Sequence, residues 1–224
     1  MTDSDRHPSG GEMERERAEA VRAWENYYGS GQRIGGNPLS SMSERLLMEL
    51  LPLSAPFLEI GCGTGRSYAH ILATISGAFT PSFSYTGIDA SPTAVSAAST
   101  RRGMNVVRGD VFHLPLASVT FGYVYARNAL QGYSPGIADM AAAEISRVMR
   151  NGSVLLIEER GPLDRVPVPS GQRHGFPQMK PAPAVLDAFR HQLDLKAISE
   201  EFRKRRTSLG TVIVHSITAM FIKK

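Results

Sequence analysis

The sequence predicts a three-layer α/β fold, with a seven-stranded, mostly parallel sheet, helices on both faces and an antiparallel hairpin at the C-terminus. Between residues 56 and 160, short apolar runs alternate with segments of helical periodicity, a pattern typical of a parallel sheet covered by helices. The segments 193–202 and 211–222 then have strand character and are joined only by the run RKRRTSLG. Because so short a link leaves no room for a crossover helix, we expect this last pair to be antiparallel.

The N-terminal part precedes this alternation and is predicted to begin with a tail and a helix. Residues 1–13 are polar, contain Pro and Gly, and are expected to be disordered. In residues 14–28, the apolar side chains of Val21, Trp24 and Tyr28 fall on one face of a helix.

A second helix is expected at residues 42–51. Ser41 and Glu44 have the spacing of a capping box at its start, and Pro52 ends it. These features divide the chain into a disordered tail, an N-terminal helical cap and a main domain, at residues 1–13, 14–52 and 53–224.

Within the main domain, strands are expected at 56–61, 83–89, 104–110, 121–128 and 153–160, and helices at 66–76, 92–102 and 136–150. The last of these helices is the clearest, because apolar residues recur along one face. Residues 161–183 are rich in Pro and Gly and are predicted to form an irregular lid or substrate loop, since long loops in compact domains are usually functional. A short helix is expected at 183–192.

Composition limits the class of protein. The chain of 224 residues is 42% apolar and has a single cysteine, Cys62, so it can bury a core but has no internal disulfide. No apolar run is long enough to cross a bilayer and no secretory signal is recognised, so we expect a cytoplasmic protein. Residues 1–20 hold six acids and three arginines, which leaves the remainder with more than the net charge of +4. A basic body attracts anionic substrates or nucleic acid.

The run FLEIGCGTG carries the strongest local signal for ligand binding. Gly61, Gly63 and Gly65 let the backbone turn sharply and let a ligand approach, and the helix that follows starts with free N–H groups. Such groups hold a pyrophosphate or the carboxylate of an amino acid. The spacing G-x-G-x-G differs from the G-x-G-x-x-G of dinucleotide folds. Glu59 would repel a pyrophosphate, so it favours a ligand with positive charge beside the loop.

Two further acids stand at the carboxyl ends of the next strands, where ligands of open α/β sheets bind. Asp89 ends the strand 83–89 and can accept both hydroxyls of a ribose. Asp110 ends the strand 104–110 and can accept the exocyclic amino group of adenine. The three acids together indicate a ligand with a cationic centre, a ribose and an adenine.

These residues resemble the motifs of the Rossmann-like (class I) S-adenosylmethionine-dependent methyltransferases. FLEIGCGTG is similar to the first motif, YTGIDAS to the second, VVRGDVFHLPLASVTFGYVY to the third and fourth, and EISRVMRNGSVLLIEE to the passage into the fifth strand. The resemblance covers roughly residues 53–160 and is nearest to the small-molecule branch that includes quinone-biosynthesis enzymes. It implies methyl transfer from S-adenosyl-L-methionine to a small-molecule acceptor, with S-adenosyl-L-homocysteine as the product.

The resemblance also implies roles for individual residues. The methionine part of the cofactor would be lined by Glu59, Gly61, Cys62, Gly63 and Gly65, with Cys62 as a small apolar filler rather than a nucleophile. Asp89 would hold the ribose, and the adenine would lie by Ala90, Asp110 and the backbone of Val111. Arg127 would face the methionine end and the acceptor. Two departures stand out: Gly122 replaces a common aspartate, and YARNALQGYS replaces the Asn-Pro-Pro-Tyr motif of enzymes that methylate amino groups of nucleic acids and glutamine.

The remaining site candidates each have two interpretations. Tyr28 either faces the sulfonium or packs on the sheet, and Arg33 either pairs with the cofactor carboxylate or is a solvated loop residue. His174, in GQRHGFPQMK, is the first candidate for a proton acceptor, followed by Glu158 and Tyr133. The histidines are scattered without metal-ligand spacing, so no metal is expected.

Other functions remain open at this point. The basic run RKRR at 203–206 is first interpreted as a solvated hairpin tip, and its alternative is a phosphate-contacting patch of a methyltransferase for RNA or protein, with a small partner subunit. A non-catalytic cofactor-binding protein and, more distantly, a nicotinamide oxidoreductase are further alternatives. We expect a monomer or a homodimer, with nucleic acid not favoured as a partner.

Overall fold

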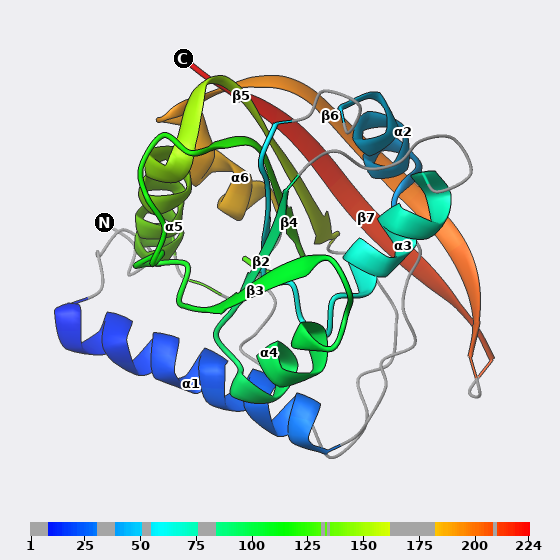
Figure 1. The fold of residues 1–224 in the computed structure, drawn as a ribbon, viewed down its shortest axis with the longest axis horizontal. Helices are drawn as coiled ribbons and strands as arrows, with labels where there is room; N and C mark the ends of the chain where they lie inside the picture. Colours follow the sequence, from blue (N-terminus) through cyan, green and yellow to red (C-terminus); the bar gives the residue numbers. More distant parts are fainter. Residues whose placement is uncertain are drawn as a thin grey trace, which may run out of the picture.

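The structure is a computed structural model that describes residues 9–30, 39–50, 55–75, 84–130, 133, 135–161, 182–207 and 210–224. Its centre is a seven-stranded sheet in the order β3-β2-β1-β4-β5-β7-β6 (Figure 1). The first five strands in the chain are mutually parallel, and β7 is antiparallel to both β5 and β6. The strands are β1 (Phe57–Ile60), β2 (Tyr85–Asp89), β3 (Met104–Arg108), β4 (Phe121–Arg127), β5 (Met149–Arg160), β6 (Leu193–Thr207) and β7 (Gly210–Lys223).

Helices cover both faces of this sheet, as the sequence predicted. One apolar cluster joins the sheet to α5 and α6, and a second joins its other face to α2, α3 and α4. Helix α1 is different, because it runs along the outside of the sheet, beside α4 (Figure 1). The helices are α1 (Gly10–Gly29), α2 (Ser41–Leu50), α3 (Arg66–Ile75), α4 (Pro92–Ser99), α5 (Pro135–Val148) and α6 (Ala182–Arg190).

The alternation of side chains along the central strands decides which groups meet at the site. Leu58 and Ile60 of β1 pack in the cluster under α5 and α6, whereas Phe57 packs in the cluster under α2 and α3. Because successive side chains point to opposite faces, Glu59 lies on the same face as Phe57.

The first helix begins earlier than the sequence indicated. It starts at Gly10 and not at residue 14, so residues 10–13, expected in the disordered tail, are helical. The reason is a capping box: the side chain of Glu12 accepts a hydrogen bond from the backbone N–H of Ser9 at 2.7 Å.

The cap of the second helix is also displaced by one residue. Ser40, rather than Ser41, caps α2, because its Oγ accepts a hydrogen bond from the backbone N–H of Ser43 at 3.0 Å. Ser41 instead donates its backbone N–H and its hydroxyl to the carboxylate of Glu201 in β6. This contact ties the start of α2 to the edge of the sheet.

The basic run was expected in the turn between the last two strands, and this expectation is wrong. Strand β6 continues through it, with register partners from Arg203↔Val214 to Arg206↔Thr211. Since β6 is the edge strand, its charges lie where they discourage pairing with another sheet.

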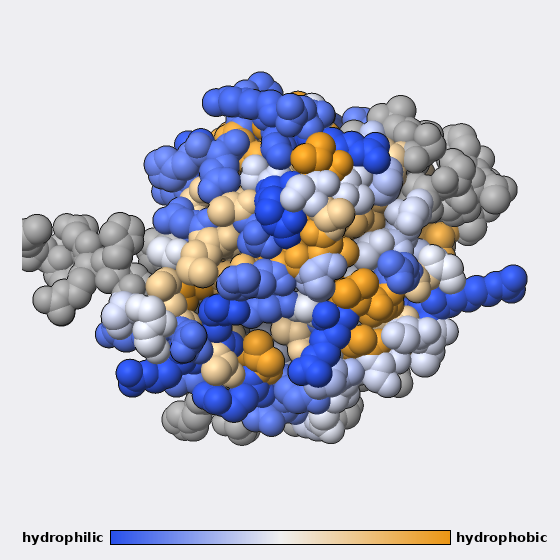
Figure 2. Space-filling view, turned by 60° about the vertical axis from the view of Figure 1, so that its left-hand side comes forward, coloured by the Kyte–Doolittle hydropathy of each residue, from blue (hydrophilic) through white to orange (hydrophobic). Residues whose placement is uncertain are grey.

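The surface of the protein carries both hydrophobic and hydrophilic areas. On the face drawn in Figure 2, hydrophobic groups form separate areas between hydrophilic side chains. Among the described residues, no helix is long and apolar enough to span a membrane.

Candidate functional site

The glycine loop after β1 has the shape that the sequence predicted. Gly61, Gly63 and Gly65 have φ angles of +64°, +53° and +70°, a region that favours glycine. A Cβ placed on Gly61 would lie 2.6 Å from Cβ of Ala129, and one placed on Gly63 would lie 2.6 Å from the hydroxyl of Tyr28. The loop therefore has no room for side chains, because other parts of the chain already approach its backbone closely.

Cys62 behaves as the apolar filler that we expected. It is buried, and its backbone N–H donates to the carbonyl of Ile88 at 3.0 Å. Burial raises the pKa of its thiol well above the usual range, so the reactive thiolate form is disfavoured.

Asp89, at the end of β2, binds the glycine loop to the start of α4. Its Oδ2 accepts a hydrogen bond from the backbone N–H of Gly63 at 2.8 Å, and its Oδ1 accepts one from Ser91 N–H at 2.9 Å. The neighbouring Ala90 N–H also bonds to this carboxylate. Burial raises the pKa of Asp89, and the hydrogen bonds oppose that shift. These three N–H groups fill three of the roughly four lone-pair sites of the carboxylate, so one site remains for a hydroxyl group of a ligand.

Glu59 is the most buried of the three predicted acids, with 1% of its surface exposed. Its Oε2 accepts a hydrogen bond from the hydroxyl of Tyr85 at 2.6 Å. Burial raises the pKa of Glu59 to about 7, although hydrogen bonds from Tyr85 and Ser67 and the charge of Arg127 act in the opposite direction. This carboxyl group is held from within the protein, beneath the glycine loop.

Asp110 follows β3 and is held from two sides. Its Oδ1 accepts a hydrogen bond from Phe112 N–H at 3.0 Å, and its Oδ2 pairs with Nη2 of Arg17 at 2.6 Å. Val111 is partly buried and packs against the core. Tyr133 packs its ring edge-on against Phe112, with centroids 5.0 Å apart. Tyr133, predicted as a proton acceptor, thus lies on the adenine side of the expected site.

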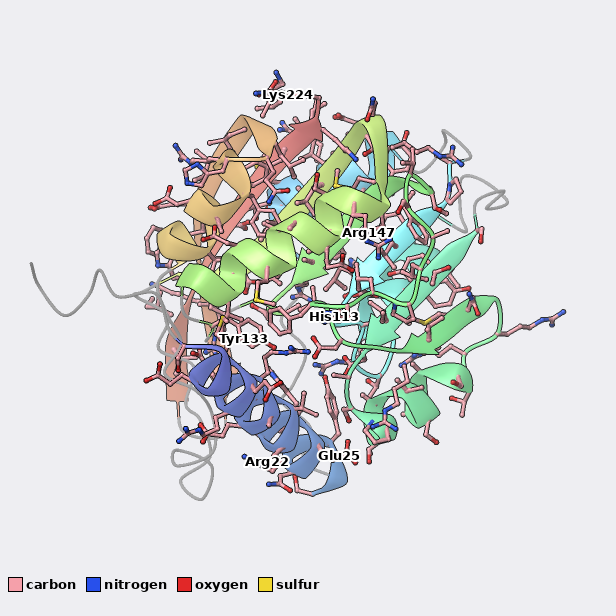
Figure 3. The ribbon with its side chains drawn as sticks, turned by 90° about the vertical axis from the view of Figure 1, so that its left-hand side faces the viewer. Arg22, Glu25, His113, Tyr133, Arg147 and Lys224 are labelled. Carbon is pink, nitrogen blue, oxygen red and sulfur yellow. The ribbon has the colours of Figure 1, made fainter. Side chains whose placement is uncertain are left out.

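Helix α1 reaches across the ends of β1 and β2 through polar contacts. The carboxylate of Glu25 accepts hydrogen bonds from the hydroxyls of Ser91 and Thr93 at the start of α4. Figure 3 shows Glu25 near the end of α1 that lies beside α4. Together with the contact between Tyr28 and Gly63, these bonds place α1 as a cover over the predicted cofactor site.

The aromatic residues of α1 form a cluster of their own. Trp24 stacks on Tyr28 at 6.0 Å between centroids and meets Tyr27 edge-on at 5.8 Å. Tyr27 is buried and meets the ring of Tyr28 with centroids 5.0 Å apart. Burial, with the nearby charge of Asp89, raises the pKa of Tyr28 well above the usual range, so its hydroxyl stays protonated.

The ends of β4 and β5 carry a buried polar network. Arg127 Nε pairs with Oε1 of Glu158 at 3.1 Å, and both side chains are largely buried, with 13% and 3% of their surfaces exposed. Oε2 of Glu158 accepts hydrogen bonds from the hydroxyl of Tyr125 at 3.2 Å and from Ser40 N–H at 3.1 Å. Glu158, a candidate proton acceptor, is therefore already occupied by structural partners.

Sequence reasoning missed the next residue, Glu159. Its Oε1 accepts a hydrogen bond from Leu130 N–H at 3.0 Å, and Ala129 N–H also bonds to the carboxylate. Burial raises its pKa to about 8, so the group is protonated at neutral pH. Its Oε2 is buried and has no hydrogen-bond partner among the described residues. The sequence did contain an indication of a second buried carboxyl group, because the apolar run SVLLIEER holds two adjacent acids.

Sequence reasoning also missed Arg17 and Glu25, which contact the predicted site from α1. Position along the helix could have indicated such a contact, because Arg17 lies one turn from the buried Ala20, on the inner face of α1. Two predicted site residues, Arg33 and His174, and most of the predicted loop at 161–183 lie outside the described residues. Within the described ranges, no group of three or more His, Cys, Asp or Glu could hold a metal ion.

Comparisons with known proteins agree with this geometry. Residues 57–152 match the family model described as a methyltransferase domain. No curated protein sequence matches the chain.

Several solved structures share the fold. The N-methyltransferase NodS from Bradyrhizobium japonicum WM9, solved with S-adenosyl-L-homocysteine, is 16% identical, with 92% of this chain and 98% of NodS covered and a TM-score of 0.63. A structure from work on the conversion of a disulfide bond into a thioacetal group during echinomycin biosynthesis is 18% identical, with 91% of both chains covered and a TM-score of 0.68.

The [4+2]-cyclase SpnF is similar in the same way. It is 17% identical, with 96% of this chain and 97% of SpnF covered and a TM-score of 0.60. At these identities the likeness establishes a shared fold only, and a cyclase among the neighbours shows that the fold can serve more than one chemistry.

Proposed function

We propose that this chain, which carries a methyltransferase domain of the Rossmann-like class at residues 57–152, moves the methyl group of S-adenosylmethionine to a small-molecule acceptor. One observation carries the proposal. The glycine loop and the acids Glu59, Asp89 and Asp110 follow or end three neighbouring strands, so they line one edge of the sheet. This is where open α/β sheets bind nucleotide-like ligands.

The residues present fit this cofactor. The positive φ angles of Gly61, Gly63 and Gly65 suit glycine and keep side chains off the loop, so its backbone N–H groups can face a ligand. We propose that the loop and Glu59 hold the methionine part, that Asp89 holds the ribose hydroxyls and that Asp110 holds the adenine amino group, with Ala90 and Val111 beside the ring. Arg127 would lie at the acceptor end.

When bound, the cofactor supplies a methyl group on a sulfonium, which is a good leaving group. The protein therefore contributes mainly by positioning the two reactants and excluding water. Helix α1 is suited to excluding water because it covers the glycine loop through Tyr28 and the start of α4 through Glu25. We further propose that Tyr28 and Arg33 contact the methionine end of the cofactor.

A base is needed only if the acceptor must lose a proton. Of the three candidates, Glu158 is bound to Arg127, Tyr125 and Ser40, and Tyr133 lies beside Phe112 near the adenine end. His174 stays the first candidate.

A second candidate function, methylation of RNA or protein, rests on the basic run in β6. Arg203 pairs with Glu201 at 2.7 Å, and Lys204 and Arg206 are exposed. Because this run forms part of an edge strand, charge on a sheet edge explains it without a nucleic acid. Binding of RNA that weakens steeply with salt would favour the second function.

The direct test is calorimetry with S-adenosylhomocysteine on the full chain. Asp89→Ala removes the proposed ribose acceptor, and Gly63→Asp puts a side chain at a φ of +53° against Tyr28. Each should weaken binding by about a hundredfold or more, while the protein stays folded.

Two matched controls separate binding from stability. Asp187→Ala removes an aspartate whose side chain is 68% exposed, and Gly152→Asp alters a glycine with a φ of +74° that has open space around it. Both should keep the affinity of the unchanged protein. Binding of NAD with no binding of S-adenosylhomocysteine would overturn the proposal in favour of an oxidoreductase.

A further inference from the structure

Arg17 makes the closest contact between α1 and the predicted adenine end of the site. Its Nη2 lies 2.6 Å from Oδ2 of Asp110, and its guanidinium carbon lies 4.8 Å from the ring centroid of Phe112. The two side chains of the ion pair are 23% and 31% exposed. Arg17 is thus partly enclosed, with an acid on one side and an aromatic face on the other.

This arrangement fixes the orientation of the carboxylate. Phe112 N–H holds Oδ1 of Asp110, and Arg17 holds Oδ2, so the group is bound at both oxygens. Each carboxylate oxygen has two lone pairs, so one on each oxygen remains free to accept a donor from a ligand. The Phe112 ring, which holds the guanidinium, is itself buried and packed against Tyr133.

A second, independent feature points to a ligand at this place. Nε of Arg17 is buried and has no hydrogen-bond partner among the described residues. Buried donors are nearly always paired, so an unpaired one calls for a partner that the described residues do not supply.

We propose that Arg17 is a positioning residue of the adenine subsite, which orients Asp110 and thereby sets the preference for a purine with an exocyclic amino group. The inference rests on the proposed function, because it takes S-adenosylmethionine as the ligand. Asp110 accepts the amino group, and Arg17 keeps the accepting oxygen in place. A purine with a carbonyl at that position meets a fixed carboxylate and is rejected, because two acceptors face each other.

The experiment compares two ligands on the full chain by calorimetry. One is S-adenosylhomocysteine, and the other is its inosine analogue, in which a carbonyl replaces the amino group. In Arg17→Ala, affinity for S-adenosylhomocysteine should fall about tenfold, the value of one charge-assisted hydrogen bond, whereas affinity for the analogue should change about twofold or less. The preference between the two ligands should therefore fall about fivefold or more.

Two variants make the result specific. Arg15→Ala changes an exposed arginine of the same helix, whose Nε donates to the carbonyl of Gly11, and should leave both affinities unchanged. Arg17→Lys keeps the charge but loses the planar fork, so its ligand preference should lie between those of Arg17→Ala and the unchanged protein.

Other outcomes overturn the inference. Equal losses for both ligands in Arg17→Ala would make Arg17 a purely structural contact of α1. Tighter binding of S-adenosylhomocysteine would show that Arg17 competes with the adenine. If the unchanged protein binds neither ligand, the proposed function is wrong. If it binds both and Arg17→Ala leaves the preference between them intact, only the inference about Arg17 is wrong.

Discussion

The candidate site at the carboxyl ends of the strands has two halves, and each half holds its acidic side chains in a different way. At β2 and β3, Asp89 and Asp110 bind backbone N–H groups and a side chain from α1, a helix outside the sheet. At β4 and β5, Glu158 and Glu159 bind groups of neighbouring strands and of the loops that adjoin them. The first half depends on a partly exposed ion pair with α1, whereas the second is held by buried bonds to β4, to the loop after β4 and to Ser40 at the start of α2.

The difference teaches which half can adapt to a ligand. Ion pairs that are partly exposed contribute little to stability, so α1 can separate from Asp110 at small cost, although Arg17 orients the carboxylate while the helix is in place. A buried ion pair that loses one partner leaves an uncompensated charge, so the pair of Arg127 and Glu158 resists change. We therefore interpret the first half as the cofactor end, where contacts with α1 can break at small cost. The second half is the rigid part of the site.

The largest expected effect comes from placing the same substitution in both halves. Arg127→Met leaves Glu158 buried without its cation and should lower the free energy of unfolding by about 3 kcal/mol or more. Arg17→Met breaks the partly exposed pair and should lower it by about 1 kcal/mol or less. Urea unfolding of both variants gives the two values, and equal losses would remove the distinction between the halves.

Glu159 gives the rigid half a dependence on pH. Its pKa of about 8 in the folded protein lies above the value of about 4.3 expected for an unfolded glutamate. Between these values the folded state binds the proton and the unfolded state does not, so stability falls as pH rises from about 5 to about 8.

Glu159→Gln cannot ionise, so the variant should lose the part of the pH dependence of stability that comes from this residue. Glu59, with a pKa of about 7, contributes a similar pH dependence, which remains in the variant. As pH rises in this range, the free energy of unfolding should fall less steeply for the variant than for the unchanged protein. The difference between the two, variant minus unchanged protein, should increase by up to about 1.4 kcal/mol for each pH unit. Urea unfolding at pH 5, 6, 7 and 8 measures it. A difference that stays constant with pH would mean that Glu159 is ionised in the folded protein.

The fold could be predicted from the sequence because its evidence is local. Alternating apolar runs and helical segments gave the parallel strands, and the short link after residue 202 gave the antiparallel pair. Of the two errors at helix starts, one has a local cause and the other does not. Ser9 and Glu12 extend α1, and Ser40 replaces Ser41 as the cap of α2 because Glu201, distant in sequence, takes Ser41 as a partner.

The candidate site was predictable only in part, for the same reason. The glycines and the acids Asp89 and Asp110 belong to motifs at strand ends, where their position follows from chain order. The contacts of Arg17 and Glu25 join residues more than sixty positions apart in the chain, and no short-range pattern specifies them. Glu159 looked equivalent to Glu158 in sequence, yet alternation along β5 turns the two carboxyls to opposite faces of the sheet.

The smallest expected effect tests whether α1 is the adaptable element. Glu25→Gln weakens the bonds to Ser91 and Thr93, which join α1 to the start of α4, and should cost about 0.5–1 kcal/mol. Because this loss falls on the local opening of α1, amide hydrogen exchange in that helix should speed up about threefold, while exchange in β4 and β5 stays the same. Glu19→Gln, on the exposed face of the same helix, is the control and should leave both unchanged. If β4 and β5 speed up with α1, the helix does not open by itself, and the two halves of the site form a single cooperative unit.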